Sequence, residues 1–221
     1  MTHPIIDRPH TVSAFDLQLG EVRSIISRMS DLACASLSDA MDALYCADRP
    51  AALRIVEQDR EIDDLERDLE RLALMMIMSR GPMAEDLRFL IVAIRIGKML
   101  ERTGDQAKRI ARRVETLGGM QFTPAFPLVR SMERYAGAMI CNAIDSFNNA
   151  SLEGARAVVQ ADQELNAMNR MLVQSCCDEM DNRALPSREG VEVISIGKQL
   201  ERVGDYASNI AGDVTYMLTG E

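Results

Sequence analysis

The chain of 221 residues has no tryptophan and few other aromatic residues, with five phenylalanines and four tyrosines. Ala, Leu, Met, Ile, Glu and Arg dominate instead, and these residues suit helices better than strands. Long hydrophobic runs are also missing, since stretches such as LALMMIM at 72–78 are far too short to span a bilayer. At 47% hydrophobic and 27% charged residues, the composition is globular. We therefore expect a helical globular protein that approaches a membrane only through partners.

Histidine is scarce, and no cysteines have the spacing of a zinc site. The only histidines, His3 and His10, lie near the N-terminus, and no Cys-x-x-Cys pair occurs, which argues against structural zinc. The opening MTHPIIDRPH lacks the apolar stretch of a signal peptide. With an odd number of cysteines, this favours reduced thiols and a cytoplasmic location. The cysteines are Cys34, Cys46, Cys141, Cys176 and Cys177.

The sequence also contains no P-loop, Gly-rich dinucleotide motif or Ser-His-Asp arrangement, so we do not expect an enzyme. Its formal net charge is −9, which argues against a uniformly basic surface for nucleic acid. An acidic surface instead suits cations or basic protein partners.

Helical periodicity extends over most of the chain. We expect a first helix over about 14–47, a second to about Ser79 and a third from about Pro82 to Gly118. Asp48 is a good N-cap, and Gly81-Pro82 is a helix break. After a linker at 120–127, one helix ends near residue 150, Ser151 caps the next, and the last follows a break at Pro186 and ends near Leu218.

The chain is internally duplicated. IGKMLERTGDQAKRIARRV at 96–114 and IGKQLERVGDYASNIAGDV at 196–214 are identical at 12 of 19 positions. Asp42 and Asp59 match Asp145 and Asp162 at an offset of 103. We predict an all-α fold of two tandem three-helix bundles with approximate twofold symmetry and six long helices. The predicted parts are a flexible tail at 1–13, a first repeat at 14–119 and a second repeat at 120–221.

Carboxylates are paired one helical turn apart on faces turned away from the predicted core. Asp59 and Asp63 form one pair, and Glu101 and Asp105 another, which antiparallel packing would place side by side. Like charges at this spacing are mildly unfavourable, and a hard cation such as Mg²⁺, Mn²⁺ or iron would reverse the effect. The alternative is a solvated acidic face neutralised by ordinary ion pairs. The candidate cations for those pairs are Arg60, Arg67, Arg102, Lys108 and Arg109.

Four glycines lie inside the predicted helices, where each costs about 1 kcal/mol relative to alanine. Close approach by a neighbouring helix or a ligand would explain them, as would inheritance through duplication. They are Gly97, Gly104, Gly197 and Gly204. The same third helix has a second apolar surface that must be covered by another helix or by a partner. That surface consists of Leu87, Leu90, Ile91 and Ile94.

The repeated LERTGDQAKRIA and LERVGDYASNIA, with Asp59-Arg-Glu-Ile-Asp63 and Asp86-Leu-Arg88 upstream, resemble the PhoU family of phosphate-regulon regulatory proteins. The resemblance covers the chain after its first dozen residues. It implies two three-helix bundles, often in a homodimer, and divalent-metal or iron binding at the acidic pairs.

Carried over by residue, the first implied metal site consists of Asp59, Asp63, Glu101 and Asp105. The second implied site consists of Asp162, Glu201 and Asp205. The chain departs from the family pattern at Asn166, which matches Asp63, and at Arg109, which matches Asn209. The amide lacks the charge of a carboxylate, and the arginine adds a positive charge near the first site.

The resemblance further implies a cytoplasmic adaptor that couples a phosphate ABC transporter to a sensor histidine kinase. Such an adaptor represses phosphate-starvation genes and modulates phosphate uptake. Two alternatives remain open at this point: a metal-storage bundle, and a carboxylate-bridged metalloenzyme. The second normally needs inward Glu-x-x-His ligands, which this sequence does not have.

Overall fold

The structure, a computed structural model, describes residues 9–82, 84–117 and 125–220. Within these ranges it has six long helices, one short helix and no strand, which confirms the predicted all-α class. None of the described helices is long and apolar enough to cross a bilayer. The helices are α1 (Pro9–Cys46), α2 (Arg49–Arg80), α3 (Glu85–Ala111), α4 (Val114–Leu117), α5 (Phe126–Asn148), α6 (Leu152–Asp181) and α7 (Ser187–Thr219).

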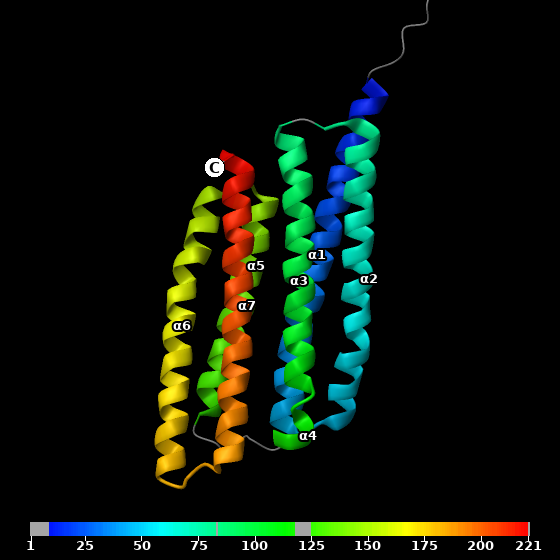
Figure 1. Cartoon of the computed structure of the whole chain (residues 1–221). Helices are drawn as coiled ribbons and strands as arrows, with labels where there is room; N and C mark the ends of the chain where they lie inside the picture. Colours follow the sequence, from blue (N-terminus) through cyan, green and yellow to red (C-terminus); the bar gives the residue numbers. More distant parts are fainter. Residues whose placement is uncertain (1–8, 83, 118–124, 221) are drawn as a thin grey trace, which may run out of the picture.

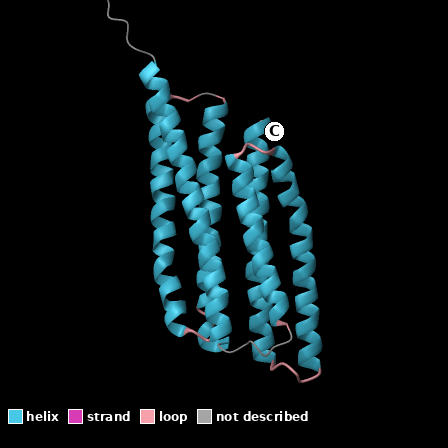
Figure 2. Ribbon diagram, turned by 180° about the vertical axis from the view of Figure 1, so that it is seen from behind, coloured by secondary structure: helices cyan, strands magenta, loops and turns pink. Residues whose placement is uncertain are grey.

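The long helices form two three-helix bundles that stand side by side (Figure 1). α1, α2 and α3 pack together in the first bundle, and α5, α6 and α7 in the second. Between the bundles, α3 lies against α7 and α1 against α5. The same two groups are seen from behind in Figure 2. The predicted arrangement of tandem three-helix bundles is therefore confirmed.

Contacts between α3 and α7 follow the duplication. Arg95 donates from Nη1 to Asp213 Oδ1 at 2.9 Å. The residues 100 positions away from this pair are Ser195 and Arg113, and they also meet: Arg113 Nη2 donates to Ser195 Oγ at 2.7 Å. Equivalent positions thus face each other in both directions across the contact. This reciprocity is what an approximate twofold axis between the bundles requires.

The predicted helix signals act as expected. Asp48 caps α2 by accepting a hydrogen bond from Ala51 N at 2.9 Å, and Ser151 caps α6 by accepting one from Gly154 N at 3.0 Å. Gly81 ends α2 in the left-handed region, with φ 54° and ψ 52°, where a side chain would be strained. These local signals fix where the outer helices α2 and α6 begin and where α2 ends.

Two predicted boundaries are wrong. α1 begins at Pro9, so residues 9–13 belong to the helix and not to the predicted tail. Proline is well tolerated at the start of a helix because its missing N–H would have no partner there. α5 begins at Phe126 with Pro127 in its first turn, so the end of the predicted linker is helical. Residues 1–8 and 120–124 lie outside the described residues.

The third helix also ends earlier than predicted. α3 stops at Ala111, and the chain turns through Arg112 and Arg113 before the short α4. Arg113 N donates to Ile110 O at 2.9 Å. This bond reaches the third preceding residue and not the fourth, so the turn is tighter than that of an α-helix. The Arg113 guanidinium is at the same time paired with Glu192 of α7. This contact with the other bundle is not visible in the periodicity of α3.

The second apolar surface of α3 is covered within the chain. Leu90 is fully buried, and Leu87, Ile91 and Ile94 are half-buried. α1 and α2 pack against one side of α3, and α7 packs against another. Of the two predicted covers, another helix is therefore the one that the structure provides.

Candidate functional site

Close packing of α3 on α2 places the first group of acidic residues. A Cβ added at Gly97 would lie 2.6 Å from Leu69 Cδ2. One added at Gly104 would lie 2.8 Å from Ile62 Cδ1 and 3.2 Å from Asp59 Oδ1. Of the two explanations for the glycines, close approach by a neighbouring helix is therefore correct. It brings the Asp59 carboxylate directly over the backbone of α3.

The second repeat is built in the same way. A Cβ at Gly197 would lie 2.8 Å from Asn169 Oδ1 and also collide with Leu172. A Cβ at Gly204 would lie 3.3 Å from Asp162 Oδ1. Each bundle thus places one aspartate of its middle helix over a glycine of its last helix, next to the acidic pair on that helix.

In the first repeat, a lysine lies between the carboxylates. Lys108 Nζ forms ion pairs with Asp59 and, at 2.6 Å, with Asp105. Burial alone would lower the pKa of Lys108, but its bonds to Asp105 and Asp59 outweigh burial and raise it. Asp59 is only 6% exposed, and burial raises its pKa despite the nearby ammonium group. Lys108 therefore acts as a built-in cation for this site.

The rest of the first group is less enclosed. Glu101 Oε2 lies 3.0 Å from Lys98 Nζ, and Asp63 is half-buried close enough for its charge to raise the pKa of Asp59. The sequence placed all these carboxylates on an outward face, which is wrong for the buried Asp59. Arg109, expected to bring positive charge to the site, is exposed, and the neighbouring Lys108 has that role instead.

In the second repeat, amides replace part of the charge. Asn166 Nδ2 donates to Asp162 Oδ2 at 2.8 Å, and Asn169 Nδ2 donates to Glu201 Oε2 at 3.0 Å. Glu201 also pairs with Lys198 on the exposed side of α7. Asp205 is exposed as a residue, but partial desolvation of its carboxylate raises its pKa, and the charges of Asp162 and Glu201 raise it further. With three carboxylates and one paired lysine, against four carboxylates and two paired lysines in the first repeat, the two clusters have the same formal charge, but only the first has an ammonium group between its aspartates.

One further position separates the two repeats. Ser208 stands where the first repeat has Lys108, 100 positions earlier. Among the described residues, the buried atoms Ser208 Oγ and Asp162 Oδ1 have no hydrogen-bond partner. No ammonium group bridges Asp162 and Asp205 in the part of the chain that the structure describes. At this position the second cluster thus has oxygen atoms without a hydrogen-bond partner, whereas the first has the ion pairs of Lys108.

A metal ion fits the two repeats unequally. In the described residues, no three His, Cys, Asp or Glu side chains converge as a finished metal site would. Lys108 already neutralises Asp59 and Asp105, so an ion there would have to displace it. Asp162, Asp205 and the Ser208 hydroxyl offer the hard oxygen ligands that Mg²⁺ or Mn²⁺ prefers, and a buried oxygen of Asp162 lacks a partner. The two repeats therefore differ in that Lys108 lies between the aspartates of the first, whereas no ammonium group lies between those of the second in the described residues.

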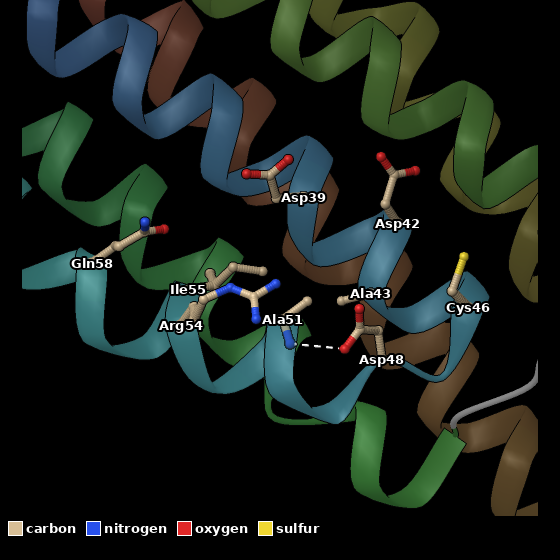
Figure 3. A pocket seen from close by; sticks show the side chains of 9 residues that line it. All are labelled: Asp39, Asp42, Ala43, Cys46, Asp48, Ala51, Arg54, Ile55 and Gln58. Carbon is tan, nitrogen blue, oxygen red and sulfur yellow. Dashed lines mark hydrogen bonds between the residues drawn. The ribbon is translucent and has the colours of Figure 1, made fainter.

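Each repeat also has a pocket at the same place, between its first two helices. The first has a volume of about 300 Å³ and is lined by Asp39, Asp42, Asp48 and Arg54 among others (Figure 3). The second, of about 330 Å³, is lined by the residues 103 positions later. In the figure, Asp48 is turned back to cap Ala51. The pocket therefore recurs at equivalent positions, but Asp145 is the one charged residue in the lining of the second, against four in the first.

The sequence named Lys108 as one of five candidate cations for ordinary ion pairs without singling it out, and it did not point to Ser208. A signal was present, because Lys108 lies three positions after Asp105 and can reach it along the helix. The second pairing, to Asp59 across the helix contact, depends on the packing of α2 against α3.

Comparison with known proteins identifies the family. The PhoU domain model matches twice, at residues 26–114 and 129–214. A protein of Zymomonas mobilis named phosphate-specific transport system accessory protein PhoU homolog is 35% identical over 212 residues, covering 96% of this chain and 90% of its own. A Caulobacter vibrioides protein of the same name is 31% identical over 215 residues, covering 96% of this chain and 93% of its own.

Two solved structures are similar over nearly the whole fold. The crystal structure of PhoU from Pseudomonas aeruginosa has a TM-score of 0.87 at 29% identity, covering 94% of this chain and all of that one. The phosphate transport system regulatory protein PhoU from Streptococcus pneumoniae has a TM-score of 0.86 at 26% identity, covering 94% of this chain and 98% of that one. The chain, with its two matched repeats, belongs to the PhoU family.

Proposed function

We propose that this protein is a cytoplasmic regulatory adaptor of phosphate transport. In this role it couples a phosphate ABC transporter to a sensor histidine kinase and represses phosphate-starvation genes while phosphate is plentiful. The observation that supports the proposal is the match along almost the full length to relatives named as accessory proteins of phosphate-specific transport. Those names describe accessory and regulatory proteins and not enzymes.

The fold suits an adaptor in physical terms. The two bundles present long helix surfaces, and the whole chain has a formal net charge of −9, so partner domains with basic faces would be attracted to it. The outer helix α2 has exposed acidic residues in i,i+3 pairs with arginines, such as Asp64 with Arg67. Exposed pairs of this kind contribute little to stability, so they are free to exchange partners on docking. Homodimerisation is part of the proposal and would double these surfaces.

We extend the proposal to a hard cation, Mg²⁺, Mn²⁺ or iron, at the second repeat. Asp162, Glu201 and Asp205 would hold it, with the Ser208 hydroxyl beside them. The support is the raised pKa of Asp205 and the unpartnered buried oxygens of Asp162 and Ser208. When bound, the ion would supply positive charge that offsets the repulsion among these carboxylates. Asp59, Asp63, Glu101 and Asp105 of the first repeat would function without an ion, because Lys108 takes its place.

A deletion experiment tests the adaptor role. A promoter reporter for phosphate starvation is measured in cells grown in abundant phosphate, with and without this protein. We expect the reporter to be on in the deletion strain and off again when the chain is restored. A reporter that stays off, with no transporter or kinase component co-purifying with the chain, would contradict the proposal.

Complementation then separates the acidic clusters from general surface charge. The variants E201Q and D205N, and separately E101Q and D105N, are compared with the matched control D64N/D68N. The control residues are exposed acids on α2 that pair with their own neighbours Arg67 and Arg71. We expect the control to repress like the natural chain and the cluster variants to repress less.

Metal storage is the alternative function that the acidic clusters raise, and stoichiometry distinguishes it. A storage protein binds many ions reversibly, whereas the site proposed above would bind one ion per chain. Equilibrium dialysis with Mn²⁺ that saturates near one ion would favour the adaptor, and loading of many ions would favour storage.

A further inference from the structure

Two cysteines from different repeats meet at the contact between α1 and α5. Cys34 lies on α1 and Cys141 on α5, 107 positions apart, and their sulfur atoms are 3.8 Å apart. The two thiols share a hydrogen bond in which either sulfur can be the donor. No part of the proposed adaptor function uses them.

The pair occurs only once in the duplicated fold. At the offset of 103, Cys34 corresponds to Gly137 and Cys141 to Ser38. Cys34 Sγ lies 3.8 Å from the carbonyl oxygen of Gly137, so a residue and its own counterpart touch here. The thiols therefore lie next to the approximate twofold axis, where one covalent bond would join the two bundles.

The two thiols differ in accessibility and in acidity. Cys141 is exposed, and the hydrogen bond with Cys34 lowers its pKa to about 7. Cys34 is half-buried, and its pKa is raised by the same hydrogen bond and by burial. The nearby charges of Asp31 and Asp145 work against the thiolate but do not outweigh the hydrogen bond on Cys141. An accessible sulfur with thiolate character is the kind that oxidants attack.

The other cysteines lack this arrangement. Cys46 and Cys177 are exposed, and among the described residues neither has a hydrogen bond to another thiol. Cys176 is buried, and burial raises its pKa to about 11. They provide internal controls for reactivity within the same chain.

We propose that Cys34 and Cys141 are an oxidisable pair that forms a reversible disulfide between the two repeats when the protein meets a peroxide. The Cys141 thiolate attacks one peroxide oxygen and the O–O bond breaks. Cys141 becomes a sulfenic acid, and the leaving hydroxide takes up a proton to become water. The Cys34 sulfur then attacks the Cys141 sulfur, the S–O bond breaks, and hydroxide leaves with the proton of Cys34 as a second water. Two thiols are oxidised and one peroxide is reduced.

The bond would tie α1 to α5 at the contact between the bundles. The contact between α3 and α7 would remain noncovalent, held by pairs such as Arg95 with Asp213. Oxidation would therefore remove the freedom of the two repeats to shift against each other. A thiol reductant would restore it, as expected of a disulfide in a reducing compartment.

The test uses the purified, fully reduced chain treated with hydrogen peroxide at low protein concentration. We expect a product lighter by two hydrogens and a non-reduced peptide map in which the Cys34 peptide is linked to the Cys141 peptide. Dithiothreitol should reverse both changes. Before oxidation, brief alkylation at pH 7 should label Cys141 about tenfold faster than Cys46 or Cys177, since roughly half of a thiol with a pKa near 7 is thiolate.

The variants C34S and C141S are compared with the control C46S/C177S. We expect the control to form the intramolecular bond at the natural rate and both single variants to lose it. Circular dichroism of each variant confirms that it is folded, so that loss of the bond reports chemistry. A folded natural chain whose Cys34 and Cys141 stay unlinked, or link only between molecules, would overturn the proposal. Because the assay involves neither phosphate nor a partner, its result is independent of the adaptor role.

Discussion

Replacing Lys108 with serine is the sharpest test of the asymmetry between the repeats. The change gives the first repeat the residue that the second has at Ser208. It leaves Asp59, only 6% exposed, without its ammonium partner. Breaking a fully buried pair costs about 3–5 kcal/mol. Since the side chains of Lys108 and Asp105 are 20% and 31% exposed, we expect about 2–3 kcal/mol.

For a chain of this length, that loss corresponds to a fall in Tm of roughly 4–12 °C. The assay is thermal unfolding followed by circular dichroism at pH 7.5 without divalent ions. The matched control is K98S, because Lys98 pairs with Glu101 in the same helix but its side chain is 46% exposed. We expect the control to lose less than about 1 kcal/mol.

Two further readouts separate charge from packing. The unpaired Asp59 of K108S would have a pKa raised further by burial, so the variant should regain stability as the pH falls toward that value. Added Mn²⁺ should also raise the Tm of K108S, because the displaced ammonium no longer competes for the carboxylates. If K108S melts within the range of K98S and responds to neither pH nor Mn²⁺, Lys108 is not the cation of this site.

The remaining predictions concern the glycines, the second cluster and the thiols. In chemical unfolding, G104A should lower the free energy of unfolding by roughly 1–3 kcal/mol, because its Cβ would collide with Ile62. G137A has open space around its Cβ and should raise the free energy of unfolding by about 0.5–1 kcal/mol through helix propensity. Equal changes in both variants would refute close packing as the reason for Gly104. The raised pKa of Asp205 favours folding below its ordinary value of about 4, and this contribution is lost as the pH rises through the raised value. D205N should therefore match the natural chain near pH 3 and be the more stable at pH values above the raised pKa of Asp205, and a constant difference would contradict this. Oxidation of the Cys34–Cys141 pair closes a loop of about 100 residues, which restricts the unfolded chain and should raise the Tm by roughly 5–10 °C, less than loop-closure entropy alone would give. An unchanged Tm of the linked form would show that the bond strains the fold.

Local sequence determined much of the architecture. The Asp48 and Ser151 caps and the Gly81 stop form as their residue types require, because each is decided within a few neighbouring residues. The early end of α3 could not be read in the same way. Arg113 there contacts Glu192 of the other bundle, a residue 79 positions away.

In the candidate site, too, some features follow from the sequence and others from contacts between distant residues. The sequence by itself determined that the chain is helical, duplicated and acidic, and it selected the carboxylates, since periodicity and internal identity are properties of the order of residues. Only the tertiary structure decided that Asp59 is buried against Gly104 and that Lys108 reaches Asp59 from the next helix. Only the tertiary structure brought Cys34 to Cys141 across the two repeats. The physical reason is that burial and ion pairing depend on which helix faces supply the surrounding atoms, and those atoms come from residues about 50 to 100 positions away.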